Sequence, residues 1–115
     1  MSKDQLEPKL AELMQTIPEI EGIIAFSPEG KIITGQTIED MDKDSIAAKA
    51  SKLLENLKSF GSEIGKGNVI EITINYEEGY VVIAFGEKYS ILSFVDSTNK
   101  MQLGLLSRGL KNLLV

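Results

Sequence analysis

Three consecutive apolar segments between residues 68 and 96 constrain the fold of this chain more than any other feature. Residues 69–76, 80–85 and 89–95 are rich in β-branched and aromatic side chains, and each gap between them is three residues long and contains a glycine. Such gaps are typical of tight antiparallel hairpins. We therefore expect a meander of three antiparallel strands.

The first two strands of this meander differ in the number of faces that they bury. Residues 69–76 alternate between apolar and polar side chains, which is typical of a strand with one buried face. Residues 80–85 are apolar on both faces, so that strand must be covered from above and below. The alternating pattern places the first strand at an edge of the sheet. The doubly apolar second strand predicts helices on both faces of the sheet.

The rest of the chain supplies three helices and one hairpin. Apolar residues recur at helical spacing in residues 3–16, from Asp42 to Ile64, and in residues 99–114. Residues 23–26 are apolar on both faces, and a Ser-Pro-Glu-Gly turn leads to a short partner strand at residues 31–34.

These elements predict a single α/β (α+β) domain over residues 1–115, in the order α-β-β-α-β-β-β-α. The most apolar strands belong in the middle of the sheet, and hairpin partners stay adjacent. We therefore expect a five-stranded antiparallel-type sheet in the order 2-1-5-4-3, sandwiched between helices.

Residue types that carry common chemistry are absent or scarce. The chain has no His, no Cys and a single arginine, so the usual general base, the commonest zinc ligands and the bidentate phosphate clamp are missing or nearly so. We expect no enzyme, no cofactor and no metal. A net charge of −5 disfavours binding to nucleic acid. Without a long apolar run or a signal-peptide pattern, we expect a cytoplasmic protein with no direct membrane insertion.

Three local patterns resemble functional motifs, but each has a simpler explanation. Residues 61–67 resemble a phosphate loop, yet the spacing is wrong and they follow a helix where a phosphate loop opens one; we interpret them as a helix C-cap. Residues 40–44 resemble a calcium loop, but Ser45 and Ser51 stand in place of its glycine and glutamate. We interpret these acids as favoured by the helix dipole, and Arg108 as a solvated charge.

Residues 20–33, which read IEGIIAFSPEGKII, resemble the opening hairpin of Roadblock/dynein light chain domains. The long central helix, the meander ending at Asp96 and the leucine-rich last helix with Asn99 and Gly104 follow in the family's order. The chain is similar to the stand-alone archaeal and bacterial members. The resemblance implies homodimers or heterodimers that regulate or scaffold small Ras-like GTPases, some as GTPase-activating partners. It also implies pairing through the edge strand and the central helix.

The residues and the resemblance together predict a homodimer. An edge strand without proline and with one charge in its middle invites pairing with a second copy. On the central helix, we expect one apolar stripe to cover the chain's own sheet, namely Ile46, Ala50, Leu53, Leu57, Phe60 and Ile64. A flank of small residues beside it would let a second helix approach closely. The predicted interface comprises Ala47, Ala50, Ser51, Leu54, Gly61 and Ser62 on the helix and Glu71, Ile72, Thr73, Ile74 and Asn75 on the strand.

A small Ras-like GTPase is the expected second partner, docked on the outer face of the paired helices. The residues predicted to contact it are Lys52, Glu55, Lys58 and Ser59. Activation and passive scaffolding both fit the sequence, as do a homodimer and a heterodimer. The alternative function is a small-ligand sensor of similar layered architecture, which needs a cavity with convergent polar groups. The polar groups available for that cavity are Tyr89, Ser90 and Ser93.

Overall fold

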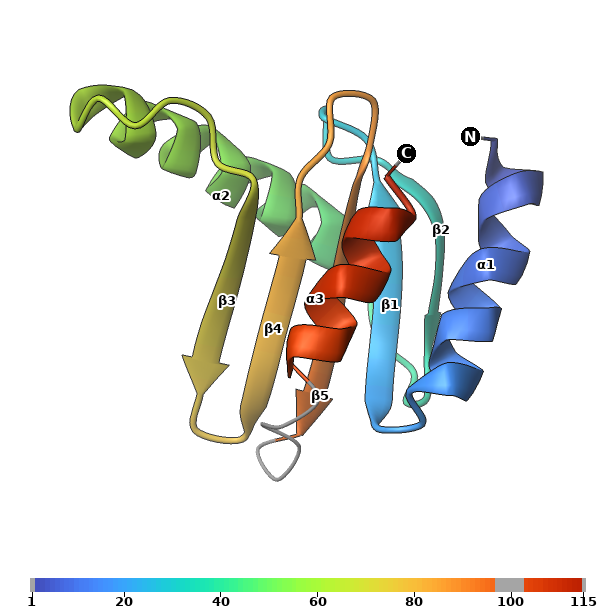
Figure 1. The fold of residues 1–115 in the computed structure, drawn as a ribbon. Coiled ribbons are helices and arrows are strands. Elements are labelled where there is room, and N and C mark those ends of the chain that lie inside the picture. The colour runs from blue at the N-terminus through green and yellow to red at the C-terminus, as the bar shows by residue number, and fades with distance from the viewer. Residues whose placement is uncertain (1, 97–102, 115) are drawn as a thin grey trace.

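Five antiparallel strands form one sheet between helices in the computed structural model of the chain (Figure 1). The structure describes residues 2–96 and 103–114. The strand order β2-β1-β5-β4-β3 confirms the predicted topology. In chain order the elements are α1 (Lys3–Thr16), β1 (Ile20–Phe26), β2 (Ile32–Thr37), α2 (Lys43–Glu63), β3 (Glu71–Tyr76), β4 (Gly79–Ala84), β5 (Ser90–Asp96) and α3 (Leu103–Asn112).

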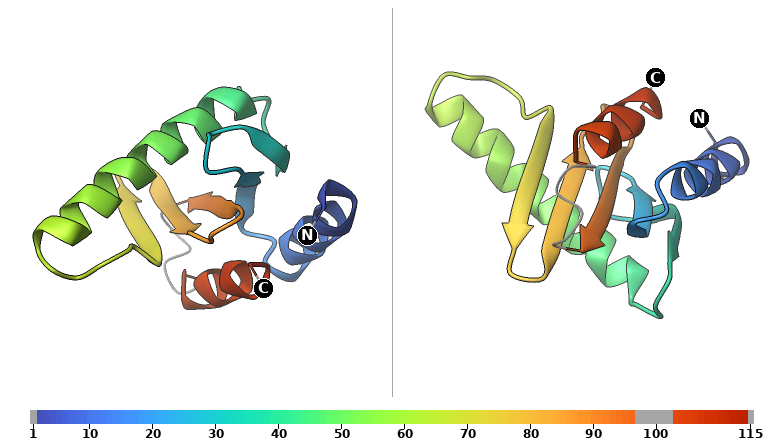
Figure 2. Two further views of the ribbon diagram at one scale, coloured as in Figure 1. Left: turned by 90° about the horizontal axis from the view of Figure 1, so that it is seen from above. Right: turned by 60° about the horizontal axis from the view of Figure 1, so that its bottom comes forward.

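The helices cover both faces of the sheet, as the doubly apolar strands require. Figure 2 shows α2 on one face and α1 with α3 on the other. The inner strand β1 sends Ile23 and Ala25 into the core under α1 and α3, and Ile24 and Phe26 into the core under α2. Successive side chains of a strand point to opposite faces of the sheet. All four side chains are fully buried because helices cover both faces.

The ends of the long helix follow the predicted signals. The Asp42 carboxylate accepts a hydrogen bond of 3.1 Å from the backbone N–H of Ser45, so Asp42 is the N-cap. Gly65 and Gly67 take positive φ angles of 71° and 81°, which stops the helix as expected of residues without a Cβ. The predicted start of the last helix, near Asn99, lies outside the described residues.

The face with which α2 covers the sheet differs from the predicted one. The N-terminal part of the small flank predicted for a second helix is buried against the chain's own sheet, and Ser51 donates a hydrogen bond of 2.6 Å to the Pro28 carbonyl in the β1–β2 turn. The main stripe is instead half-buried or exposed towards its C-terminal end, with Phe60 and Ile64 exposed by 63% and 53%. The buried residues of α2 are Ala47, Ala50, Ser51 and Leu54.

The orientation of α2 has a geometric cause. α2 crosses the sheet obliquely, with its closest backbone contacts on β1 and β2, and its C-terminal half extends past the edge strand β3 (Figures 1 and 2). Small side chains let the helix lie close to the sheet where it crosses. The larger side chains near Phe60 have no strand of the same chain beneath them. Ala47, Ala50, Ser51 and Leu54 are therefore part of the protomer's interior and not of a helix-pairing surface.

Candidate protein-interaction site

The free edge of β3 presents a defined set of backbone groups. The Phe85 N–H donates to the Ile70 carbonyl at 2.9 Å, and Glu71 lies opposite Ala84 in the same register. Because bonded and non-bonded pairs alternate along an antiparallel ladder, the N–H and C=O groups of Glu71, Thr73 and Asn75 point away from β4. The predicted edge position of this strand is thus confirmed, and its open groups belong to those three residues.

On the α3 side of the sheet, Glu71 joins the edge strand to the last helix. Its carboxylate accepts a hydrogen bond from the Ser107 hydroxyl and lies 3.4 Å from the Lys111 ammonium. The Glu71 side chain is therefore held inside the protomer while its backbone faces outwards. Thr73 and Asn75, which share this face, are exposed.

On the α2 side, an apolar groove of about 380 Å³ lies between the helix and the outer strands. The oblique path of α2 leaves this part of the sheet uncovered. Exposed apolar surface of this kind is typical of a protein-binding site. The apolar side chains that line the groove include Met41, Ile46 and Leu53 on the helix side and Ile74, Tyr76, Val81 and Phe94 on the sheet.

Large apolar side chains are exposed along the α2 side of this edge. Phe60 and Ile64 lie on the overhanging end of α2, while Ile70 and Tyr76 flank β3 and are exposed by 70% and 58%. A soluble chain rarely leaves this many large apolar groups together in water unless another surface covers them. The edge, the groove and the overhang together define the candidate site.

The remaining predicted site residues fall into two groups. Gly61 packs against its own loop, because the Lys66 N–H donates to the Gly61 carbonyl at 2.8 Å and a Cβ at Gly61 would overlap the Gly67 carbonyl. The predicted close approach of a second helix at Gly61 is therefore wrong, whereas Ser62 is exposed. The four residues predicted to contact a GTPase are all exposed on α2, namely Lys52, Glu55, Lys58 and Ser59.

The polar groups proposed for a ligand sensor are used within the fold. The Tyr89 hydroxyl donates to the Leu113 carbonyl, and the Ser93 hydroxyl donates to the Gly22 carbonyl at 2.9 Å. Ser90 accepts a hydrogen bond of 3.3 Å from the Gly86 N–H. Burial raises the pKa of the Tyr89 phenol above its ordinary value. These groups hold strands and helix ends together, so they do not converge on a ligand cavity.

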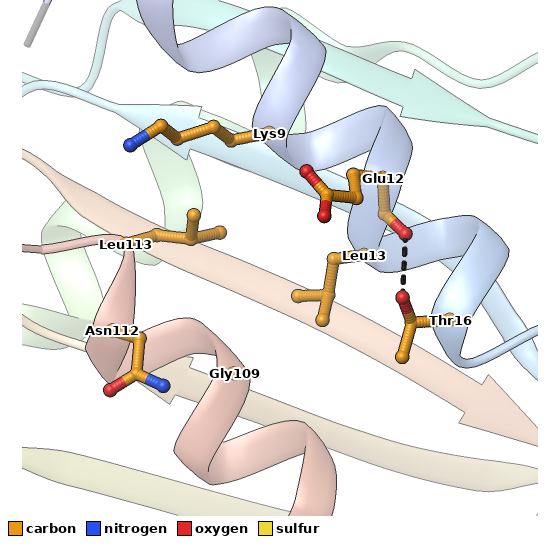
Figure 3. Close-up of a pocket in the computed structure, with 7 residues that line it drawn as sticks. All are labelled: Lys9, Glu12, Leu13, Thr16, Gly109, Asn112 and Leu113. Atoms are coloured by element: carbon orange, nitrogen blue, oxygen red, sulfur yellow. Dashed lines mark hydrogen bonds between the residues drawn. The ribbon is translucent and has the colours of Figure 1, made fainter.

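A second groove, of about 330 Å³, separates α1 from α3 on the opposite face of the sheet (Figure 3). Leu13 packs over Gly109, where a Cβ would come within 2.8 Å of its side chain. The Thr16 hydroxyl is already bonded to the Glu12 carbonyl at 3.0 Å. Lys9, Glu12 and Asn112 also bring polar side chains to this groove. No open strand edge lies beside them, so the apolar surface at β3 is the better candidate for binding another protein chain.

Within residues 2–96 and 103–114, no three His, Cys, Asp or Glu side chains gather as a metal site would need. No helix in this part of the chain has the length and apolar character required to cross a membrane.

The fold is thus a layered α+β sheet whose β3 edge is open and flanked by exposed apolar side chains. A family model described as the Roadblock/LC7 domain matches residues 8–95, so the chain belongs to the Roadblock/LC7 domain family. The family predicted from the sequence is thus confirmed. No curated protein sequence matches the chain.

Solved structures share the fold at low sequence identity. Myxococcus xanthus MglB superposes with a TM-score of 0.86 at 12% identity, covering 96% of this chain and 83% of that chain. A Roadblock/LC7 domain from Streptomyces avermitilis gives a TM-score of 0.79 at 18% identity, with 90% and 87% covered. A chain of the LokiProfilin1/rabbit actin complex gives a TM-score of 0.56 at 21% identity, covering 99% of this chain and 96% of that chain. These likenesses support the predicted layered architecture of Roadblock domains.

Proposed function

We propose that the protein is a homodimeric regulator or scaffold that binds a small Ras-like GTPase. The observation that carries this proposal is the open edge of β3 beside the overhanging end of α2. Both features expose backbone and apolar groups that a second protein chain would cover. Membership of the Roadblock/LC7 family supplies the expected partners, a second copy and a GTPase.

The homodimer forms by antiparallel pairing of β3 with the same strand of a second copy. A two-fold axis beside Thr73 joins two sheets of five strands into one of ten. The same rotation carries the overhanging end of each α2 across the edge, over the outer strands of the other copy. Phe60 and Ile64 of one copy then lie over the apolar groove beside Tyr76 and Phe94 of the other. This contact replaces the one first predicted through the small residues of α2.

The GTPase docks on the outer face of the paired helices. Lys52, Glu55, Lys58 and Ser59 are exposed on α2. Lys52 and Ser59 lie on the side of the helix away from the buried residues, whereas Lys58, four residues after Leu54, lies on the same side as Leu54 and lines a small recess with it. Mixed charges at the rim of a contact favour specificity and association rate more than affinity. We therefore expect salt-dependent binding to a GTPase surface of mixed charge.

The protein is not itself an enzyme in this proposal. Its single arginine, Arg108, lies on α3, on the face of the sheet away from α2 (Figure 2). An arginine finger must reach the nucleotide of the docked GTPase, and Arg108 lies on the wrong side of the sheet to do so. Any stimulation of GTP hydrolysis must therefore come from positioning the catalytic groups of the GTPase itself.

Two measurements test the proposal. Light scattering at micromolar concentration should report twice the chain mass of 12.6 kDa. Small GTPases of the source organism, loaded with GDP or with a non-hydrolysable GTP analogue, should be captured by the wild-type chain. The double variant Lys52→Glu/Lys58→Glu should lose that capture while remaining dimeric. The matched control is Lys3→Glu/Lys9→Glu on α1, which should retain it. Failure of every GTPase to bind in either state would reject the regulatory role.

A further inference from the structure

A recess of about 230 Å³ lies where β3 turns into β4. Tyr76 lines it from the α2 side of the sheet, Tyr80 packs on the opposite face against the core under α1 and α3, and Glu21 and Glu78 are its acidic lining residues. Aromatic faces and carboxylates both attract a cation. Among the described residues, neither carboxylate is engaged in an ion pair. The recess could therefore bind a positively charged side chain, and no described residue of the same protomer supplies one.

The open edge of β3 determines which part of a second copy lies beside this recess. Glu71, Thr73 and Asn75 direct their backbone groups outwards, and only one two-fold pairing joins all three. In that register Thr73 lies opposite Thr73 of the second copy, and Glu71 lies opposite Asn75 of the second copy. This step rests on the homodimer proposed above.

The same register brings two exposed apolar side chains together. Continuing the pairing by one residue beyond Asn75 places Tyr76 opposite Ile70 of the second copy. Both side chains lie on the α2 side of the sheet, because they are an even number of residues from Ile74, which lines the α2 groove. They are exposed by 58% and 70% in the single chain. Directly opposite residues of an antiparallel pair are in side-chain contact, so each would cover the other.

The residues that precede Ile70 in the second copy then run beside the β3–β4 turn. Lys66 stands in that segment, between two glycines with positive φ, and its side chain is exposed with no ion pair to a described residue. We infer that the recess is a composite site, in which Lys66 of the second copy pairs with Glu78 while Ile70 of the second copy covers Tyr76. The two-fold axis makes two such sites in each dimer.

Charge reversal tests the ion pair. Lys66→Glu or Glu78→Lys alone should raise the dimer dissociation constant about tenfold, since two exposed pairs are lost and like charges replace them. The combined variant Lys66→Glu/Glu78→Lys should restore most of the wild-type affinity. The matched control is Glu87→Lys in the β4–β5 turn, at the other end of β4, which should leave the dissociation constant unchanged.

Disulfide trapping tests the register independently, and the chain has no native cysteine to interfere. Opposite residues of a bonded antiparallel pair have Cα atoms about 5.5 Å apart, within the range that a disulfide spans. Thr73→Cys should therefore cross-link to itself under mild oxidation. Glu71→Cys should cross-link only when it is mixed with Asn75→Cys.

The outcomes separate the two proposals. A wild-type chain that is monomeric by light scattering overturns the homodimer and this site together. A wild-type dimer in which Glu71→Cys cross-links to itself overturns the register, and with it the site. A dimer whose affinity is not restored by the double charge reversal overturns the Lys66–Glu78 pair, although the homodimer still stands.

Discussion

The ring of Phe94 lies directly over Gly22, across the pairing of β5 with β1. A Cβ at Gly22 would overlap the ring, and the Gly22 carbonyl also accepts the Ser93 hydroxyl. The ring can therefore reach the α2 groove only because residue 22 has no side chain.

Replacing this glycine should destabilise the fold. We expect Gly22→Ala to lower the free energy of unfolding by about 1–3 kcal/mol through overpacking against Phe94, measured by urea denaturation. Gly104→Ala on α3 is the control, because a Cβ there meets no atom within 4 Å. That variant should be neutral or more stable by up to about 1 kcal/mol, since alanine is the better helix former. Equal effects of the two substitutions would argue against the Gly22–Phe94 contact.

Proline at the centre of the edge should separate the two copies without unfolding either. The Thr73 N–H points away from β4, so Thr73→Pro removes a donor to the second copy and no hydrogen bond within the sheet. We expect a monomer by light scattering with a folded circular dichroism spectrum. Ile72→Pro is the contrasting variant, because the Ile72 N–H bonds to β4 and its loss should destabilise the protomer. A dimeric Thr73→Pro chain would contradict pairing through this edge.

A charge at the end of α2 should also separate the two copies, because this end of the helix forms a second part of the proposed dimer contact. Phe60 is 63% exposed in the single chain, so Phe60→Asp should change the stability of the monomer by less than about 0.5 kcal/mol. In the dimer the same carboxylate would be buried in an apolar groove, which is strongly unfavourable. We expect sedimentation analysis to show mainly monomer. Asn56→Asp, an exposed change on the same helix, should stay dimeric.

The anchor between β3 and α3 should contribute to protomer stability. Removing the Glu71 carboxylate leaves the Ser107 hydroxyl and the Lys111 ammonium without their partner. We expect Glu71→Ala to lower the free energy of unfolding by about 1 kcal/mol. The measurement belongs in the Thr73→Pro background, where dimer formation does not add to the apparent stability. No change there would mean that α3 is held by its leucines alone.

Alkaline pH should weaken the attachment of the C-terminal end of α3. Burial raises the pKa of Tyr89 in the folded state, so the folded chain binds the phenolic proton more tightly than the unfolded chain does. The corresponding stability is present below the unfolded pKa of about 10 and is lost as pH rises through the folded value. Urea denaturation between pH 8 and pH 11 should show a fall in stability that is smaller in Tyr89→Phe. An equal fall in the wild-type and Tyr89→Phe chains would show that the Tyr89 phenol does not cause the loss of stability at alkaline pH.

Strand order was predictable because the number of buried faces of a strand can be read from its sequence: an inner strand is apolar on both faces, and an edge strand alternates. The two fully apolar strands had to be central, and the alternation around Thr73 placed β3 at the edge. The Roadblock-like hairpin at residues 20–33 identified the family, which the family match then confirmed.

The face of α2 was not predictable in the same way. Two adjacent stripes of this helix are small or apolar, and periodicity alone does not tell which of them meets the chain's own sheet. Ala47 and Leu54 lie at the close crossing, while Phe60 lies beyond the sheet edge. The exposed pair Ile70 and Tyr76 carried a usable signal, because apolar residues flanking an edge strand have no neighbour on one side.

The two edges of the sheet are formed by different strands, β2 and β3. Isologous pairing uses the same edge of both copies, so each β3 is consumed once the dimer forms. What remains at both outer ends is β2, which packs against α1 and bonds to it through Thr34 and Glu7. The proposed assembly thus stops at two copies instead of growing into a fibre.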